Sequence, residues 1–553
     1  MDVIKNEKTN KIKNGGKIMI NRNIKSALYT TLILAFSFSL IMPSTAFEDG
    51  LFNGKKFSSS IEIIRDLPRF GKTTRTQVYL PRSVNYEIAF IFDEGTVVQD
   101  LNDNGQVVGW NDYGSYLWQN FTGNVETIFL GSLGGGGCSP YAINNFGLVV
   151  GASRTNYGDP YQDFFHHGFV LNPEDTDGNG ILDLWFRDDD GNGVNDLMQD
   201  LGMTYLISPG GSGEPLYHPP TFATAINDTG VVVGFQSEQL LHVGWRYTAF
   251  KIIPEDTDGN GKPDLWFRDD DGNGFNDLMI DLGPLGEEQD CAEPKKINDN
   301  GITVGYSWQT SDDYLKARAV YWYNTGIHNL GLLYGGGNLK SFAYSINNLN
   351  QIVGESEICP PTGGIRPHAF IWDDVDGMRD LGVLDPECYH EVSESHALDI
   401  NDRGQIVGYC WYGEFGDIGY LLLPLDTDDD SNPDTWYYNQ SGLSPLEGGT
   451  NDLMFRLNDF VVQIYAYGTP FVLNERGWIL CGEYAALLTP LLGDINADGI
   501  VSWRDIDPLV CAISLNEDEF NNQFPEWIYW AADCNQDDVV SWRDIDPFVN
   551  LMQ

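Results

Sequence analysis

The stretch from Ile400 to Tyr409, INDRGQIVGY, carries the pattern on which the chain is built. An apolar strand end leads into an Asn/Asp-Asn/Asp-x-Gly turn, whose residues tolerate positive φ, and a β-branched strand that ends in Gly follows. This order of residues is typical of a β-hairpin. Six further stretches repeat it, beginning at Leu101, Ile143, Ile226, Ile297, Ile346 and, in a weaker form, Leu473. Seven hairpins in one chain predict a repeat fold.

The spacing of the repeats indicates the size of one unit. Successive repeats begin 42, 83, 71, 49, 54 and 73 residues apart, and the longer intervals contain recognisable insertions. A bare unit is therefore about 40 to 50 residues long, which is the length of a four-stranded propeller blade.

A second half-motif supplies two more strands to each unit. The segment 368–372, HAFIW, predicts a strand, Asp376-Gly377 a turn, and the segment 379–382, RDLG, another strand. Similar sequences begin at Gly168, Ala249 and Ala317. It resembles the extracellular repeat family named for its His-Ala-Phe (HAF) tripeptide, over most of residues 61 to 490, and this resemblance implies an exported repeat domain but no particular reaction. We predict an all-β, seven-bladed β-propeller of four-stranded blades.

The two ends of this domain suggest how the ring closes. The last unit supplies three strands, at 471–474, 478–482 and 484–488, while Ile61 to Leu67 near the start resembles a fourth. We predict that this N-terminal strand completes the seventh blade. The alternative, an open solenoid-like array, is less favoured because it would leave sheet edges exposed.

The first 46 residues are typical of an export signal. A Lys/Arg-bearing segment reaches Lys25, an apolar stretch runs from Ala27 to Met42, and Ser44-Thr45-Ala46 offers a cleavage site. A membrane anchor is the less favoured alternative because the apolar run is short. Met19 is an alternative start. We therefore expect a signal peptide at 1–46, the propeller at 47–490 and a tail at 491–553, in a protein that is secreted or held at the cell surface.

The net charge excludes some partners. The chain carries a formal charge of -48 at pH 7. Removal of residues 1–46, with seven Lys/Arg and two Asp/Glu, leaves -53. Such a surface repels nucleic acid and anionic membranes, and it suits cation binding or a salty habitat. The eight cysteines of an exported chain permit disulfides, for which Cys511 with Cys534 is the first expectation and Cys359 with Cys388 the second.

Two acidic insertions, 175–198 and 256–279, differ at three positions only, and 426–454 is a degenerate third copy. Oxygen ligands at alternate positions, with Gly allowing a tight turn, suit a flexible calcium cage, whereas magnesium would keep more water. The candidate calcium ligands are Asp175, Asp177, Asn179, Asp183, Asp188, Asp190, Asn192, Asp196, Asp256, Asp258, Asn260, Asp264, Asp269, Asp271, Asn273 and Asp277. The alternative is a solvated acidic loop. The pattern resembles the calcium loops of thrombospondin type 3 repeats, and its place between the third and fourth strands of a blade predicts a structural or partner-facing role.

The tail carries two loops with the ligand spacing of an EF-hand-like calcium site, and a helix is expected after each. Asp at the twelfth position, where EF-hands place Glu, differs from an ordinary EF-hand. The candidate ligands are Asp494, Asn496, Asp498, Ile500 (backbone carbonyl), Ser502 and Asp505 in the first loop, and Asp533, Asn535, Asp537, Val539 (backbone carbonyl), Ser541 and Asp544 in the second.

Paired loops at the end of an exported chain resemble a type I dockerin. The resemblance implies a small α-helical module that folds around calcium and docks with a cohesin-like domain or a cell-surface protein. Three features depart from the family: Asp538 replaces the loop Gly, the loops begin 39 residues apart, and Trp503-Arg504 and Trp542-Arg543 stand where many dockerins carry a Ser-Thr pair. These departures affect the partner more than the calcium sites.

The sequence contains none of the common catalytic signatures, such as a nucleophile elbow, HExxH, a Walker loop or CxxC. His166-His167 could form a metal pair, but a surface role is favoured, and His368 belongs to the repeat itself. The 15 Trp and 27 Tyr could stack on sugars, yet aromatic residues also fill blade interfaces. We name no catalytic residue.

Three functions are compatible with these features, in this order. The first is a calcium-binding, non-catalytic exported propeller that binds protein or glycan and is tethered through its tail. The second is a polysaccharide-degrading enzyme, a glycoside hydrolase or lyase of a cellulosome-like system, which converging carboxylates and aromatics at the mouth of the ring would support. The third is a structural surface-layer protein.

Overall fold

The computed structural model divides into two compact units, residues 1–74 and 75–553. All the residues that the structure describes lie in the second unit. They are 86–121, 125–155, 166–203, 219–240, 244–286, 290–309, 316–324, 326–335, 339–360, 364–384, 394–411, 416–425, 433–447, 449–457, 469–482, 485–490, 493, 495, 505–515, 532, 534, 540–545 and 548.

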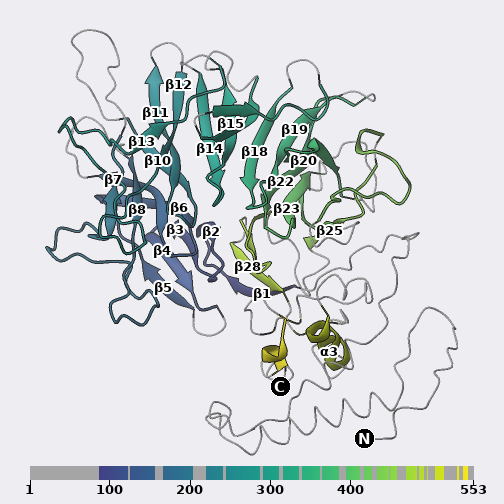
Figure 1. Ribbon diagram of the computed structural model, residues 1–553, viewed down its shortest axis with the longest axis horizontal. Coiled ribbons are helices and arrows are strands. Elements are labelled where there is room, and N and C mark those ends of the chain that lie inside the picture. The colour runs from purple at the N-terminus through teal and green to yellow at the C-terminus, as the bar shows by residue number, and fades with distance from the viewer. Residues whose placement is uncertain are drawn as a thin grey trace, which may run out of the picture. The chain divides into compact units, whose positions relative to one another are not determined.

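The strands form seven antiparallel four-stranded sheets, the blades, which follow one another in chain order (Figure 1). Blade one contains β2 (Val97–Leu101), β3 (Val107–Asn111), β4 (Gly114–Gln119) and β5 (Glu126–Phe129); blade two β6 (Gly134–Ile143), β7 (Val149–Thr155), β8 (His166–Leu171) and β9 (Met198–Asp200); blade three β10 (Thr221–Ile226), β11 (Val232–Leu240), β12 (Gly244–Ile252) and β13 (Met279–Asp281). Blade four contains β14 (Cys291–Ile297), β15 (Thr303–Trp308), β16 (Arg318–Tyr323) and β17 (Gly326–Asn329); blade five β18 (Ser341–Ile346), β19 (Ile352–Ile358), β20 (Arg366–Asp373) and β21 (Gly377–Gly382). Blade six contains β22 (Glu394–Ile400), β23 (Ile406–Trp411), β24 (Asp417–Leu422) and β25 (Met454–Arg456), and blade seven β26 (Pro470–Leu473), β27 (Ile479–Cys481), β28 (Ala486–Pro490) and β1 (Tyr86–Ile91).

The predicted seven-bladed propeller of four-stranded blades is therefore confirmed. An N-terminal strand closes the ring, as expected, but the strand is a different one. β1 pairs with β28, from Tyr86 opposite Pro490 to Ile91 opposite Ala486. The assignment of this position to Ile61–Leu67 is wrong because β1 fills it, and residues 61–67 lie outside the described residues.

The innermost strand of every blade lines a central channel. In blades one to six this is the first strand of the blade, and in blade seven it is β26. Each of these inner strands carries a bulge two to four residues before its turn; in blade five the bulge lies between Ala343 and Ser345. The bulge brings a backbone carbonyl against the second strand, so a Cβ at Gly354 would lie 2.0 Å from the oxygen of Phe342. The Gly that was expected to end the second strand therefore lies inside it, opposite the bulge.

The first Asn of each inner turn is buried and joins two blades. Its side-chain Oδ1 accepts a hydrogen bond from the backbone N–H four residues later, and its Nδ2 donates to the backbone carbonyl of the corresponding Asn in the next blade. For example, Asn227 Nδ2 donates to the Asn298 oxygen at 2.9 Å. These cross-blade bonds run from Asn102 through Asn144, Asn227, Asn298, Asn347, Asn401 and Asn474 back to Asn102, at 2.9–3.2 Å. We call this closed cycle the asparagine ring.

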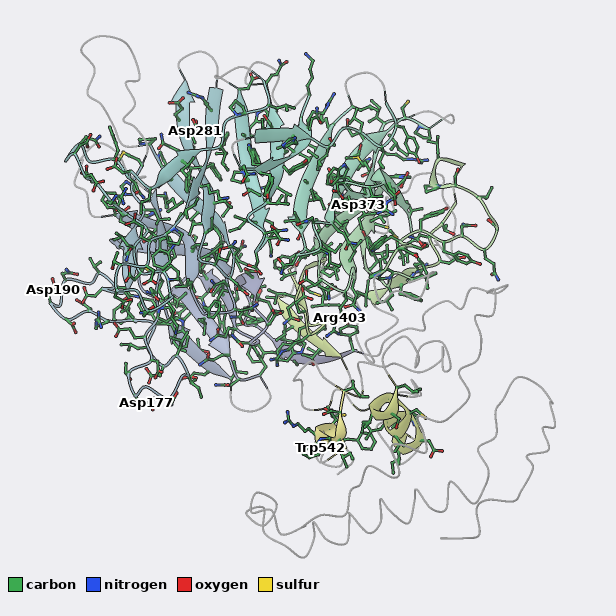
Figure 2. The ribbon with its side chains drawn as sticks, viewed as in Figure 1. Asp177, Asp190, Asp281, Asp373, Arg403 and Trp542 are labelled. Atoms are coloured by element: carbon green, nitrogen blue, oxygen red, sulfur yellow. The ribbon has the colours of Figure 1, made fainter. Side chains whose placement is uncertain are left out.

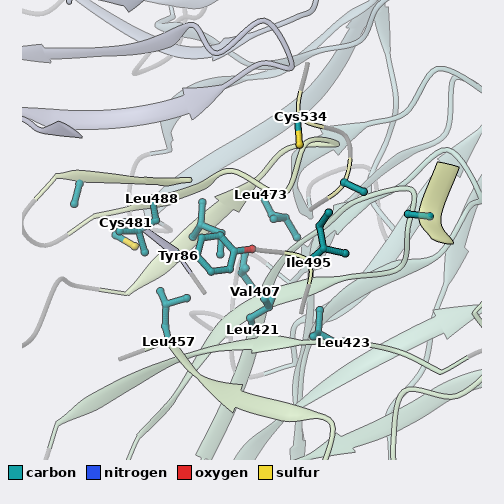
Figure 3. Close-up of a cluster of buried hydrophobic side chains, with 14 of the residues drawn as sticks. Tyr86, Val407, Leu421, Leu423, Leu457, Leu473, Cys481, Leu488, Ile495 and Cys534 are labelled. Atoms are coloured by element: carbon teal, nitrogen blue, oxygen red, sulfur yellow. The ribbon is translucent and has the colours of Figure 1, made fainter. Parts of the chain in front are cut away.

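Apolar clusters fill the interfaces between blades. Figure 3 shows the one between blades six and seven, where Val407 and Leu421 pack with Tyr86 and Leu488. The same cluster includes six buried residues of the C-terminal segment: Ile495, Leu509, Ala512, Ala532, Cys534 and Phe548. In the described part of this segment, Ile506–Ser514 form the α-helix α3 and Trp542–Asp544 form a short 3-10 turn, η8.

The helix expected after the first tail loop is thus present as α3. After the second loop, η8 is followed by helical backbone at Ile545 and Phe548, and the residues around these two lie outside the described residues. No disulfide joins Cys511 to Cys534, both of which are described. Cys388 lies outside the described residues. No helix in the described part of the chain is long and apolar enough to cross a membrane.

We expect Asn227→Asp to lower the free energy of unfolding by about 1 to 3 kcal/mol. The substitution keeps Oδ1 but removes the donor to the Asn298 carbonyl and places a carboxylate at a buried position. Urea unfolding measures the change. Asn329→Asp is the matched control, because Asn329 is exposed and its Oδ1 only accepts from Gly331 N–H. Equal stability of the two variants would contradict a stabilising role of the ring.

We expect Gly354→Ala to cost at least about 3 kcal/mol of stability, because the new Cβ would overlap the Phe342 carbonyl. Gly335→Ala is the control, since no atom lies within 4 Å of a Cβ there. Thermal melting of both variants measures the effect. A melting temperature of Gly354→Ala equal to that of the wild type would contradict the steric overlap.

Candidate functional site

A second cycle of hydrogen bonds follows the asparagine ring around the same mouth of the channel. In each blade the second turn residue accepts, through its side chain, a backbone N–H from the preceding blade; Asp299 N–H, for example, donates to Asn348 Oδ1 at 2.9 Å. The members are Asp103, Asn145, Asp228, Asp299, Asn348, Asp402 and Glu475. We call them the rim residues. Five of the seven are acidic, so this mouth carries concentrated negative charge.

Burial changes the ionisation of two rim residues. It raises the pKa of Glu475 to about 8, and the charges of Asp402 and Asp103 act in the same direction. Burial also raises the pKa of Asp228, although the N–H and side-chain amide of Asn145 oppose the shift. Asn145 donates its side-chain amide to both Asp103 and Asp228, at 2.7 and 3.0 Å, and so separates those two carboxylates.

The channel behind the rim is a cavity of about 480 Å³ whose lining includes Lys295 and Lys296 as well as several carboxylates. Burial lowers the pKa of Lys296, but the carboxylates of Asp399 and Asp100 outweigh it and the net shift is upward. Asp100 is buried, accepts the N–H of Ile143 at 2.9 Å, and has a raised pKa because of its burial. Asp399 accepts the hydroxyl of Ser345 at 2.5 Å. Sequence inspection missed this group because its members come from three blades.

The two acidic insertions connect the third and fourth strands of blades two and three, as expected. Figure 2 shows Asp177 and Asp190 on loops that project from their blade. A buried Trp and a buried Asn anchor each loop; in blade three Asn276 Nδ2 donates to the carbonyls of Trp266 and Leu201. The Asn-Asp-Leu-Met sequence that ends each insertion is therefore an anchor to the preceding blade.

The first half of each insertion folds around one aspartate. Asp175 accepts backbone N–H groups of Gly178, Asn179 and Gly180 at 2.7–3.2 Å. The Gly180 bond is the main reason why the pKa of Asp175 lies below its usual range. Asp256 makes the same bonds, and its pKa is lowered in the same way by Gly261.

Carboxylate oxygens converge in these first halves. One oxygen each of Asp175, Asp177 and Asp183 lie within 4.8 Å of one another, and so do those of Asp256, Asp258 and Asp264. Asn179 and Asn260 belong to the same loops but donate their amides to Asp177 and Asp258.

In the second halves the same backbone turn forms, with Asp188 and Asp269 accepting the N–H groups of Asn192 and Gly193, and of Asn273 and Gly274. The remaining candidates there, Asp190, Asp196, Asp271 and Asp277, accept backbone N–H bonds within the same turns. In the third insertion, residues 426–432 lie outside the described residues, while Trp436 and Asn451 repeat the anchor.

Most candidate ligands of the tail lie outside the described residues: Asp494, Asn496, Asp498, Ile500, Ser502, Asp533, Asn535, Asp537 and Val539. Of the other three, Asp505 and Asp544 are buried. Ser541 and Asp544 form a capping box at η8, in which Ser541 N–H donates to Asp544 at 2.7 Å.

Three described histidines, His166, His167 and His368, pack against or contact other side chains. His167 Nδ1 lies 2.8 Å from Asp200 and only 3% of the residue is exposed, so the expected surface role is wrong for it. His368 occupies the equivalent position in blade five and contacts Asp380 at 3.0 Å. His166 is half-buried against Phe222. The contact between His368 and Asp380 supports the packing role expected for His368.

Aromatic residues and two glutamates meet where the inner strands of blades four and five begin, at the end opposite the rim. The Tyr306 hydroxyl donates to Glu293 at 2.9 Å, and Lys295 contacts the same carboxylate at 2.5 Å. Glu355 pairs with His396 of blade six, and it accepts the hydroxyl of Tyr344. The pKa of Tyr344 is raised by burial and by Glu355. No local sequence motif predicts these pairs, because each pair joins residues of separate strands.

We expect Glu475→Gln to become more stable relative to the wild type as pH rises from about 5 to 8, as measured by the free energy of unfolding. Glu475 has a raised pKa in the folded protein, so the stability associated with its protonation is present below the unfolded pKa and is lost as pH rises through about 8. Urea midpoints across this range measure the effect. Glu94→Gln, in an exposed turn, should show a constant difference; a constant difference for Glu475→Gln would contradict the assignment.

Comparisons with known proteins cover the chain unevenly. A family described as "Protein of unknown function (DUF3466)" matches residues 285–414, from β14 through β23. No curated protein matches the chain. The β-propeller domain of the Trilobed protease from Pyrococcus furiosus is similar at 9% identity over 72% of this chain and 93% of that one, with a TM-score of 0.34. A protein of unknown function from Dyadobacter fermentans is similar at 13% identity over 61% and 96%, with a TM-score of 0.28. Similarities at this level say nothing about function, and the propeller fold follows from this chain's own strand pairings.

Proposed function

We propose that the protein is an exported, calcium-binding, non-catalytic propeller that binds a protein or glycan and is tethered through its tail to a cohesin-type partner. The observation that carries the proposal is the convergence of three carboxylates in each of two nearly identical loops. Calcium prefers six to eight oxygen ligands in a flexible arrangement, and a carboxylate cluster with Asn and backbone oxygens nearby offers that donor set. Magnesium demands stricter geometry.

The location of these loops favours a stabilising role for the ion. Each loop contains a buried Asn that donates to the carbonyl of a buried Trp in the same loop and to a carbonyl beside the preceding blade, so calcium would tie the projecting acids to a fixed frame. It would also reduce the repulsion among carboxylates in a chain whose formal charge is -48. The resemblance of the tail loops to dockerins supports a second calcium-binding region and a protein partner.

Calcium titration of the full mature chain tests the proposal. We expect calcium to release or absorb heat and to raise the melting temperature. Asp177→Asn combined with Asp258→Asn removes one charge from each cluster but leaves the turns centred on Asp175 and Asp256, and should weaken the loop sites about tenfold or more.

Two controls separate the sites. Asp281→Asn alters an exposed aspartate outside the insertions and should leave the titration unchanged. Asp494→Asn combined with Asp533→Asn tests the tail; binding that persists in this variant belongs to the insertions, and binding that disappears demotes them to solvated loops. The absence of any calcium effect would overturn the proposal.

Tethering is tested separately, by calcium-dependent binding of the full chain to an immobilised type I cohesin domain. Loss of binding in the Asp494→Asn, Asp533→Asn variant is the expected result, while retention by the wild type in excess chelator would contradict a dockerin-like mode.

A second candidate function, polysaccharide degradation, is favoured by one observation: Glu293 and Glu355 lie among aromatic residues at the end of the channel opposite the rim. Paired carboxylates can act as acid and base in glycoside hydrolysis. New reducing ends released from a polysaccharide, and lost in Glu355→Gln, would support this function over simple binding.

A further inference from the structure

We propose that the end of the channel opposite the rim binds an uncharged polysaccharide, along a row of aromatic side chains that spans blades three to five. This inference deepens the proposed function by assigning a ligand class and a place to its binding activity. It therefore rests on the proposed binding role, but not on calcium or on the tail.

The row consists of seven rings in continuous contact. Neighbouring ring centroids lie 5.0–6.5 Å apart, which is the range of favourable ring pairs. In order, the rings belong to Phe222, Phe235, Tyr247, Trp308, Tyr306, Phe342 and Tyr344. They come from the first three strands of blade three, the second strand of blade four and the first strand of blade five. Phe222, Trp308 and Phe342 lie at or next to strand ends on the side away from the rim.

Packing between the blades does not by itself explain why these seven rings lie together. Trp308 and Tyr306 are buried and form its base, as expected for rings that hold blades together. Phe222, Phe235, Tyr247, Phe342 and Tyr344 are only half-buried and leave part of their surface accessible. A run of accessible rings is costly to leave in water and is common where a ligand binds.

Polar groups accompany the rings in the pattern that a sugar requires. Glu293 and Glu355 are held in place by hydrogen bonds from Tyr306 and Tyr344, and Lys295 lies 5.3 Å from the centre of the Tyr306 ring. A pyranose has C–H faces that pack on aromatic rings and hydroxyls at its edge that donate to carboxylates. An aromatic floor with a few fixed polar groups is the usual composition of a small-molecule site.

Charge selects between kinds of glycan. The carboxylates of Glu293 and Glu355 lie at the row, and the chain as a whole is strongly acidic. Both would repel a uronate or a sulfated sugar, whereas neutral hydroxyls would meet acceptors. The chemistry therefore favours an uncharged chain of hexoses or pentoses.

Isothermal titration of the full mature chain with cellohexaose, xylohexaose and mannohexaose tests the inference, with hexagalacturonate as the anionic probe. We expect at least one neutral hexasaccharide to bind and hexagalacturonate not to bind. Tyr247→Ala should weaken the neutral sugar about tenfold, because it removes a half-buried ring from the row. Tyr344→Phe should weaken it by a smaller factor, since only the hydroxyl that contacts Glu355 is lost.

Tyr323→Ala is the matched control. Tyr323 is an exposed tyrosine, 47% accessible, at the end of the third strand of blade four, so it lies at the rim end of the blade, away from the row. It should bind the sugar as the wild type does. Melting temperatures of all three variants show which of them are folded, and Tyr344→Phe keeps the test valid if Tyr247→Ala does not fold.

The inference is overturned if no neutral hexasaccharide binds, if hexagalacturonate binds as well as they do, or if the Tyr247→Ala and Tyr344→Phe variants both bind like Tyr323→Ala. Calcium titration of the same preparation distinguishes the two proposals. If calcium binds and no sugar binds, only the proposal of sugar binding at the aromatic row is rejected. If a sugar binds and calcium does not, the calcium proposal is rejected and the proposal for the aromatic row stands.

Discussion

The cross-blade hydrogen bond made by one buried Asn in each inner turn is the interaction on which the rest of the structure depends. Each Asn fixes its own turn through Oδ1 and the next turn through Nδ2, so seven local hairpins become one closed cycle. A typical hydrogen bond contributes about 1 kcal/mol net, but a buried amide left unpaired costs more than that. The cycle therefore penalises any blade that departs from the common register.

That register determines where side chains of different blades meet. It sets the rim residues around one mouth of the channel and leaves the opposite end to the aromatic row. It also brings Lys296 near Asp100 and Asp399, three residues that occupy the same position in the inner strands of blades four, one and six. The repeat thus supplies one position per blade, and the residue type at each position gives each mouth of the channel its own chemistry.

The insertions use the same frame without disturbing it. They leave each blade between its third and fourth strands, and a buried Trp and Asn return the chain to the preceding blade. In blade three, Trp266 Nε1 donates to the carbonyl of Gly230 in that blade's own inner turn. An acidic loop of more than twenty residues can be accommodated because its ends are fixed to buried groups and its charges project into water.

The sequence by itself determined the features that local chemistry controls. Seven turns that begin with Asn predicted the number of blades, since such turns form hairpins without help from distant residues. Six of these turns end in Gly, and in blade five Asn350 takes the same place with a positive φ. The acidic patterns marked the three insertions. Tertiary structure decided what depends on pairing between distant segments. β1 rather than residues 61–67 closes blade seven, where the Tyr86 hydroxyl reaches the Gly477 carbonyl at 3.0 Å, and Glu355 meets His396 across two blades. No local pattern encodes these contacts, because each requires the completed ring to bring its partners together.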